Sequence, residues 1–285
     1  MKPARFEYHS PSTLEQAVAL LAAGGPDARV LAGGQSLIPM MNFRLAAPSA
    51  LIDLNGVSEL AYIREEGGVV VIGAMTRQRA IEFSPVVAAK LPLLNEAIKL
   101  VGHLPTRTRG TIGGSIANAD PAAEIPMVLQ ALDGSVVVCG PTGRRTIAVS
   151  ELFRDAMTTA LAADEILIEV RLPAVAAGTA CAIEEFARRR GDFAIAAIAV
   201  VIRRNGRDCE TARIATAGIT SHSQRLRAAE QNLERQGLGD AAIAAAAEAA
   251  AAGVEPLSDR NASANYRRQL TRVLTERAVR RAAAK

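Results

Sequence analysis

Two glycine pairs, each leading into a segment that can start a helix, constrain this chain of 285 residues more than any other feature. The two segments are Ala32, Gly33, Gly34, Gln35 and Ser36, and Thr111, Ile112, Gly113, Gly114 and Ser115. Because glycine has no Cβ, neighbouring backbone N–H groups can converge on an anion, and a helix N-terminus adds partial positive charge. A serine in each segment can donate its hydroxyl to a phosphate. Two such segments predict a ligand with two phosphates, held from two sides.

A single Gly-Gly pair is common in loops, and either pair alone would be interpreted as a tight turn. Two pairs with the same surroundings favour a ligand site instead. Neither segment matches Gly-x-Gly-x-x-Gly, which disfavours a Rossmann NAD site. Neither contains Gly-Lys-Ser/Thr, which disfavours a P-loop NTPase.

The composition narrows the class of protein. The hydrophobic fraction of 49% is ample for a core, which must be mostly aliphatic because aromatic residues make up only 3%. The three histidines and three cysteines follow no metal-ligand spacing, so no metal site is expected, and Cys139, Cys181 and Cys209 are predicted to be buried or inert thiols. The net charge of +4 comes without a dense basic patch, which disfavours nucleic-acid binding. With no signal-peptide pattern and no apolar run near the length of a membrane span, the chain is expected to be soluble and cytoplasmic.

The spacing of apolar residues predicts an α+β chain with two domains. Residues 1–175 are expected to form two α+β subdomains, about 1–75 and 76–175, and a turn-rich segment leads into a second domain, 176–285. A first helix is predicted between a capping-box pattern at Ser12 and Glu15 and a stop at Gly24-Gly25. Further helices are expected at 77–83, 93–101, 123–132, 225–236, 240–252 and 264–284. Strands are expected at 30–31, 51–54, 69–72, 135–139, 144–148, 166–172, 180–186, 195–202 and 212–217.

Five stretches of the sequence form a recognisable set. Residues 31–60 read LAGGQSLIPMMNFRLAAPSALIDLNGVSEL, and residues 109–126 read RGTIGGSIANADPAAEIP. The later stretches are DEILIEVRLP, EEFARRRGDFAIAA and NASANYRRQL. Together they resemble one family, the FAD-binding medium subunits of molybdenum hydroxylases, which include carbon monoxide dehydrogenase, quinoline oxidoreductase and the flavin segment of xanthine dehydrogenase. The resemblance covers almost the whole chain and includes both glycine pairs.

The resemblance implies a two-subdomain FAD-binding fold of the PCMH type, followed by a C-terminal domain of antiparallel sheet and helices. It also implies that residues 32–36 and 111–115 hold the FAD pyrophosphate, in agreement with the reading of the glycine pairs.

Three further cofactor-binding residues are implied by position in the family. Glu124 stands where the family has an aspartate that contacts the cofactor, although an acid at a helix N-terminus is also favoured by the helix dipole. Leu167 matches an apolar residue near the flavin ring, and a plain strand core is the alternative. Phe193 matches an aromatic, often Tyr, beside the isoalloxazine, with core packing as the alternative. Where some relatives have a lysine, this chain has Glu184 and Glu185, which puts lysine-based tuning of the flavin in doubt.

Basic residues lie near the second glycine pair and in the last predicted helix. His103, Arg107 and Arg109 could offset phosphate charge, but a surface position or a loop anchor is the favoured interpretation of each. Arg267, Arg268 and Arg272 are predicted to lie on a solvated helix face.

The resemblance implies a function without a catalytic residue in this chain. FAD would receive electrons from iron–sulfur clusters on a small subunit and pass them to an external acceptor, while a large subunit with the molybdenum cofactor carries the substrate chemistry. A dimer of heterotrimers is implied. Two alternatives are a non-catalytic nucleotide-binding or scaffold subunit, which the intact glycine pairs disfavour, and a stand-alone flavin oxidoreductase, which the lack of a candidate base disfavours.

Overall fold

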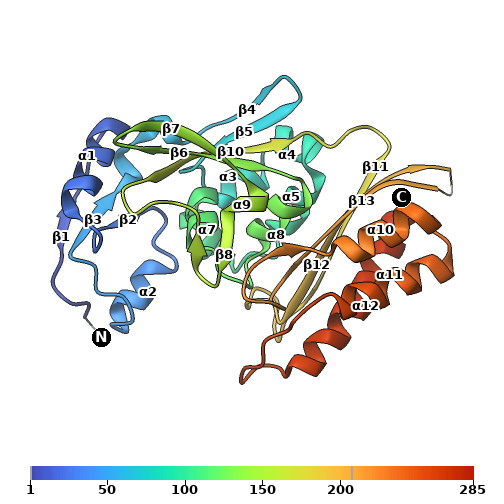
Figure 1. The fold of residues 1–285 in the computed structure, drawn as a ribbon. Coiled ribbons are helices and arrows are strands. Elements are labelled where there is room, and N and C mark those ends of the chain that lie inside the picture. The colour runs from blue at the N-terminus through green and yellow to red at the C-terminus, as the bar shows by residue number, and fades with distance from the viewer. Residues whose placement is uncertain (1, 207) are drawn as a thin grey trace.

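The computed structural model describes residues 2–206 and 208–285. In this part of the chain three sheets of three, five and four strands follow one another, with a small two-stranded sheet of β8 (Phe153–Asp155) and β9 (Thr158–Thr159) beside the second. Figure 1 shows the three sheets arranged from the N-terminal side to the C-terminal side, with the last one covered by helices.

The N-terminal unit is a parallel sheet with the order β1-β3-β2, formed by β1 (Glu7–His9), β2 (Arg29–Leu31) and β3 (Ala50–Asp53). Helix α1 (Leu14–Gly24) buries the expected apolar face and ends at Gly25, as predicted. Its N-cap is Thr13, whose hydroxyl accepts from the N–H of Gln16, so the capping residue lies one position later than predicted. Helix α2 (Leu37–Asn42) follows the first glycine pair directly.

The middle sheet is antiparallel and has the order β4-β5-β10-β6-β7. Its strands are β4 (Ile63–Glu66), β5 (Val69–Gly73), β6 (Ser135–Gly140), β7 (Gly143–Ala148) and β10 (Ile166–Pro173). The expected hairpin of β6 and β7 is present. Because β5 pairs with β10, this sheet takes strands from both sides of the subdomain division expected near residue 75. The pairing of β5 with β10 joins strands far apart in sequence, so the local spacing of residues does not predict it.

Short helices pack around this middle sheet. They are α3 (Gln78–Glu82), α4 (Pro85–Lys90), α5 (Pro92–Ala97), α6 (Leu104–Arg109), α7 (Ile112–Asn118), α8 (Glu124–Ala131) and α9 (Val149–Leu152), with two 3₁₀ turns at Leu54–Gly56 and Ser58–Leu60. Helix α7 begins at the second glycine pair and packs against β5, β10 and α8. It therefore occupies a central place among the elements that carry the predicted site residues.

The C-terminal sheet is antiparallel, with the order β11-β12-β13-β14. Its strands are β11 (Thr179–Phe186), β12 (Ala196–Asn205), β13 (Asp208–Ala217) and β14 (Gln224–Arg225). Helices α10 (Arg227–Gln236), α11 (Asp240–Ala252) and α12 (Ala264–Ala283) cover one face, while α5 and α8 pack against the sheet from the middle unit. The sheet is thus buried on both faces, which explains the nearly continuous apolar run in β12.

Arg267 corrects one prediction about the last helix. It is 6% exposed rather than solvated, and it donates to the carbonyls of Ile195 and Gly218 and to the carboxylate of Asp259, 2.8 Å away. Helix α12 crosses the ends of the strands at this point, so the guanidinium pairs with backbone oxygens that would otherwise be buried without donors.

Two of the three cysteines are buried, as predicted. Cys181 and Cys209 are buried, and burial raises the pKa of each thiol to about 11. Both thiols are therefore protonated at neutral pH, and Cys139 is a free cysteine of intermediate exposure. In the parts of the chain that the structure describes, no helix is long and apolar enough to cross a membrane.

Candidate functional site

The two glycine pairs lie side by side. A Cβ added at Gly33 would be 2.5 Å from the carbonyl oxygen of Arg109 and 2.8 Å from the Cα of Gly110, which precede the second pair. A Cβ added at Gly114 would be 3.4 Å from that of Ala32. Glycine is therefore required at position 33, while the distance at Gly114 is an ordinary contact. The structure thus brings together two segments whose residues 33 and 111 are 78 positions apart in the chain.

The first pair presents free backbone donors. It connects β2 to α2, and Gly34 has a φ of 72°, a conformation that favours glycine. Among the described residues, the N–H groups of Gly33, Gly34 and Gln35 have no acceptor within the chain. The Ser36 hydroxyl makes no capping bond to α2, so it too is available to a ligand. These features fit an anion site.

The second pair lies inside the first turn of α7, and its N–H groups are already bonded. The donors of residues 112–115 go respectively to the Thr76 carbonyl, the Ala74 carbonyl, Thr111 Oγ1 and the Thr111 carbonyl, at 3.1, 2.9, 3.0 and 3.2 Å. A Cβ added at Gly113 would lie 2.5 Å from that of Ala74. The glycines of this segment thus permit close packing, whereas the sequence predicted converging N–H donors in both.

A side-chain bridge that the sequence did not reveal joins the two segments. Asn55 Nδ2 donates to the Ala32 carbonyl at 3.0 Å, and Arg77 Nη2 donates to Asn55 Oδ1 at 2.5 Å. Arg77 Nη1 donates to the Arg109 carbonyl. Asp53 Oδ1 fixes the position of Asn55 by accepting from its backbone N–H at 2.9 Å. In the sequence Asn55 precedes a glycine, which indicates only a turn.

Positive charge accumulates at this place. Burial and the nearby guanidinium of Arg109 lower the pKa of Arg77, while Asp53 acts in the opposite direction. An anion bound between the two glycine segments would relieve this repulsion.

Two buried carboxyl groups lie behind the second segment. Glu124, the first residue of α8, is 5% exposed, and burial raises its pKa to about 8, with further contributions from the nearby carboxylates of Glu185 and Asp120. Burial raises the pKa of Glu185, on β11, to about 7. Glu185 Oε2 is buried without a hydrogen-bond partner in the described structure. For Glu124, burial outweighs the helix dipole that would favour its charged form.

Leu167 and Phe193 occupy different environments. Leu167 lies in β10 at 5% exposure and belongs to the core that α7 also enters. Phe193 lies between β11 and β12 and is 64% exposed, so core packing does not account for it. Its loop contacts the segment before the second glycine pair, since a Cβ added at Gly191 would be 2.5 Å from His103 Cε1.

Two of the residues before the second pair, His103 and Arg107, act as anchors, in line with the favoured interpretation. Arg107 Nε donates to Glu82 Oε2 at 3.0 Å, and its Nη1 donates to the carbonyls of Val101 and Gly102. His103 is packed against Gly191.

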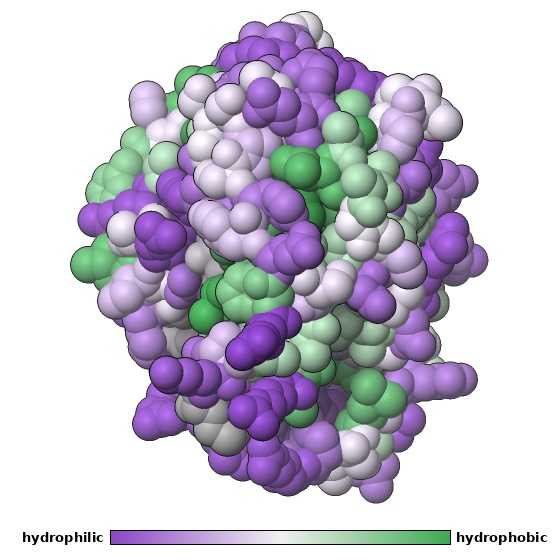
Figure 2. All heavy atoms as spheres, turned by 90° about the vertical axis from the view of Figure 1, so that its left-hand side faces the viewer, coloured by the Kyte–Doolittle hydropathy of each residue, from purple (hydrophilic) through white to green (hydrophobic). Residues whose placement is uncertain are grey.

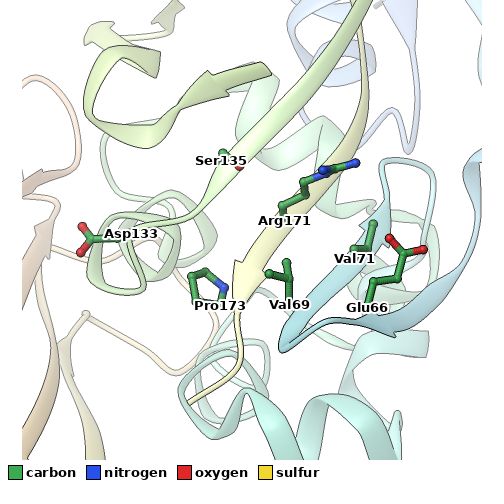
Figure 3. Close-up of a pocket in the computed structure, with 7 residues that line it drawn as sticks. All are labelled: Glu66, Val69, Val71, Asp133, Ser135, Arg171 and Pro173. Atoms are coloured by element: carbon green, nitrogen blue, oxygen red, sulfur yellow. The ribbon is translucent and has the colours of Figure 1, made fainter. Parts of the chain in front are cut away.

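Two surface hollows of about 200 and 350 Å³ lie away from these residues. Figure 3 shows the smaller one, at the end of the middle sheet, where Glu66 and Asp133 stand on opposite sides and do not converge. Its lining consists of Glu66, Val69, Val71, Asp133, Ser135, Arg171 and Pro173. Since neither hollow contains a predicted cofactor-binding residue, the candidate site is the junction of the two glycine segments.

Comparison with known proteins identifies the family of the chain. A family model described as the FAD binding domain in molybdopterin dehydrogenase matches residues 4–175, and one described as the CO dehydrogenase flavoprotein C-terminal domain matches residues 181–282. The carbon monoxide dehydrogenase medium chain of Hydrogenophaga pseudoflava is 43% identical over 279 residues, which cover 98% of this chain and 97% of that protein.

Solved structures agree along the full length. A chain of the Hydrogenophaga pseudoflava carbon monoxide dehydrogenase that lacks the Mo-pyranopterin moiety superimposes with a TM-score of 0.98 at 44% identity, covering 100% of this chain and 99% of that one. A chain of quinoline 2-oxidoreductase from Pseudomonas putida 86 gives 0.95 at 35% identity, with the same coverage.

The fold and the matches along the full chain define a flavoprotein subunit of an oxidoreductase. The chain belongs to the family of FAD-carrying medium subunits of molybdenum hydroxylases.

Proposed function

We propose that the junction of residues 32–36 and 111–115 holds the diphosphate of FAD in this chain. The observation that carries the proposal is the set of free N–H donors at Gly33, Gly34 and Gln35, placed against the second segment. The residues fit the group: a diphosphate accepts hydrogen bonds, and its charge is opposite to that of Arg77 and Arg109. When bound, FAD supplies the redox chemistry, taking electrons from iron–sulfur clusters of a partner and passing them to an external acceptor.

Individual residues of the chain contribute in different ways to the binding of FAD and to the tuning of its flavin ring. Ser115 offers a hydroxyl in the second segment, while the buried Thr111 caps α7 by accepting from the Gly114 N–H. Ile112, Gly113 and Gly114 provide the close packing of this segment. Leu167 offers an apolar surface and Phe193 an exposed ring for the isoalloxazine. Glu124 and Glu185 supply carboxyl groups that can hold protons near neutral pH.

Replacing Phe193 by alanine is expected to change flavin behaviour far more than stability. Because the ring is 64% exposed, the flavin-free chain should lose no more than about 0.5 kcal/mol of unfolding free energy. The flavin's reoxidation rate and midpoint potential should both shift. Phe153→Ala, at a buried position, is the control and should cost about 3–5 kcal/mol. A large stability loss in Phe193→Ala with unchanged flavin behaviour would remove Phe193 from the site.

The multi-subunit assembly is the second part of the proposal. A large subunit with the molybdenum cofactor and a small iron–sulfur subunit would join this chain, in a dimer of heterotrimers located in the cytoplasm. Exposed apolar side chains support partners: Phe43 and Leu45, just after α2, are 66% and 79% exposed. Figure 2, which faces the N-terminal side, shows green apolar groups among purple hydrophilic ones. Native mass measurement after co-expression tests this, and a chain that stays monomeric beside its partners would contradict it.

The domain assignment is proposed with the function: residues 1–175 bind FAD, and 176–285 complete the flavoprotein. Matches at 4–175 and 181–282, and the gap between β10 and β11, support it. The two alternatives make different predictions. A scaffold subunit would show no flavin spectrum, and a stand-alone oxidoreductase would turn over a substrate without partners.

Acid denaturation of the purified chain is expected to release its flavin. Non-covalent binding follows because neither glycine segment contains a histidine or cysteine that could form a bond to the flavin. FAD should appear in the supernatant after precipitation, where chromatography identifies it. Yellow colour that stays with the protein pellet would contradict non-covalent binding, and a colourless preparation that also fails to take up added FAD would contradict the proposed function.

A further inference from the structure

Two peptide units of the first glycine segment are oriented by side-chain amides. Asn55 Nδ2 donates to the Ala32 carbonyl at 3.0 Å, and Gln35 Nε2 donates to the Gly33 carbonyl at 3.1 Å. In a planar trans peptide the C=O of one residue and the N–H of the next point in opposite directions. Holding these two carbonyls therefore sets the directions of the Gly33 and Gly34 N–H groups, which have no acceptor among the described residues.

Asn55 is itself held on three sides. Its backbone N–H donates to Asp53 Oδ1 at 2.9 Å, and its Nδ2 donates to the same oxygen at 2.5 Å. Its Oδ1 accepts from Arg77, whose other Nη donates to the Arg109 carbonyl. The Asn55 amide thus has one orientation, and a continuous bridge runs from Ala32 to Arg109. This bridge fixes the spacing of the two segments as well as the direction of the donors.

We propose that Asn55 and Arg77 are positioning residues for a diphosphate bound between the two glycine segments. The proposal rests on the proposed function and adds to it two residues outside both segments. Asn55 is exposed and Arg77 is only partly buried, so their hydrogen bonds contribute little to folding in the flavin-free chain. Their effect should therefore appear in ligand affinity rather than in stability.

The test is a titration of the flavin-free full chain with FAD, followed by quenching of flavin fluorescence. The variants are Asn55→Leu, which keeps the side-chain volume without its hydrogen bonds, and Arg77→Met, alone and combined. Arg79→Met is the matched control, because Arg79 is two residues away and pairs with Glu82 instead. Urea unfolding of each flavin-free variant and displacement of FAD by ADP are measured in parallel.

Each single variant should raise the Kd for FAD about 10-fold, and the double variant should add little, because both residues belong to one bridge. The Kd for ADP should rise by the same factor, since ADP shares the diphosphate but has no flavin. The unfolding midpoint should shift no more than in Arg79→Met.

Three results would overturn the inference. They are Kd values for FAD within twofold of the wild type, a rise in Kd matched by an equal loss of folding stability, and weaker FAD binding with unchanged ADP binding. If the wild-type chain binds FAD, any of these results in the variants leaves the proposed function intact. Failure of the wild-type chain to bind FAD would overturn both.

Discussion

Replacing Gly33 by alanine is expected to raise the dissociation constant for FAD by about 100-fold, or about 2.7 kcal/mol, while the chain still folds. The added Cβ would lie 2.5 Å from the Arg109 carbonyl oxygen and 2.8 Å from the Gly110 Cα. Both are backbone atoms, so the two glycine segments must move apart and lose their common geometry. Fluorescence titration of the flavin-free variant with FAD measures the effect.

Gly239→Ala is the matched control for this substitution. Its φ is −74° and an added Cβ meets no atom within 4 Å, so FAD affinity and folding should be unchanged. Gly33→Val and Gly114→Val should weaken FAD binding at least as much as Gly33→Ala, because valine is larger and its χ1 is restricted. Wild-type affinity in both valine variants would refute the assignment of the ligand to this junction.

Raising the pH from 5 to 9 is expected to destabilise the flavin-free chain, and Glu124→Gln should remove much of that loss. Burial raises the pKa of Glu124 to about 8, so the folded state holds a proton that the unfolded state has lost above its own pKa of about 4.3. A group with a raised folded pKa contributes its full stability below the unfolded value and loses it as the pH rises through the folded value. With about 1.4 kcal/mol for each pKa unit, the loss is on the order of 4 kcal/mol.

Urea unfolding at pH 5, 7 and 9 measures this dependence. Glutamine cannot ionise, so Glu124→Gln should match the wild type near pH 5 and exceed it near pH 9. Glu184→Gln is the control. Glu184 is next to Glu185 on β11, but it pairs with Arg281 at 2.9 Å. The decline of stability with rising pH should therefore persist in this variant. A wild-type stability that is constant or rises over this range would show that Glu124 is ionised in the folded chain.

Several features of the fold follow from local sequence alone. The apolar face of α1, the stop at Gly25, the β6–β7 hairpin and the bounds of α11 agree with the prediction from spacing and turn residues. Such features depend on contacts between residues near in sequence, where the periods of 3.6 and 2 determine which side chains share a face. The glycine pairs likewise marked two segments as a candidate anion site, and the structure gives free N–H donors in the first of them.

Other features required the tertiary structure. Arg267 belongs to a helix end rich in arginines, and only the crossing of α12 over the ends of β12 and β13 makes it a buried donor to carbonyl groups. Glu124 and Glu185 are ordinary acids in the sequence, and their raised pKa values come from burial where α8 meets the C-terminal sheet. Burial by a distant element leaves no local pattern.

In the candidate site, too, some features follow from the sequence and others only from the tertiary structure. The sequence alone determined that Gly33 and Gly114 are positions without a side chain, and its resemblance to a family determined which cofactor to expect. Only the tertiary structure decided that the N–H donors stay free in the first segment and are bonded to the chain in the second. It also brought Asn55 and Arg77 between the two segments. The physical reason is that hydrogen-bond partners far apart in sequence are chosen by strand pairing and packing, which no local spacing of residues records.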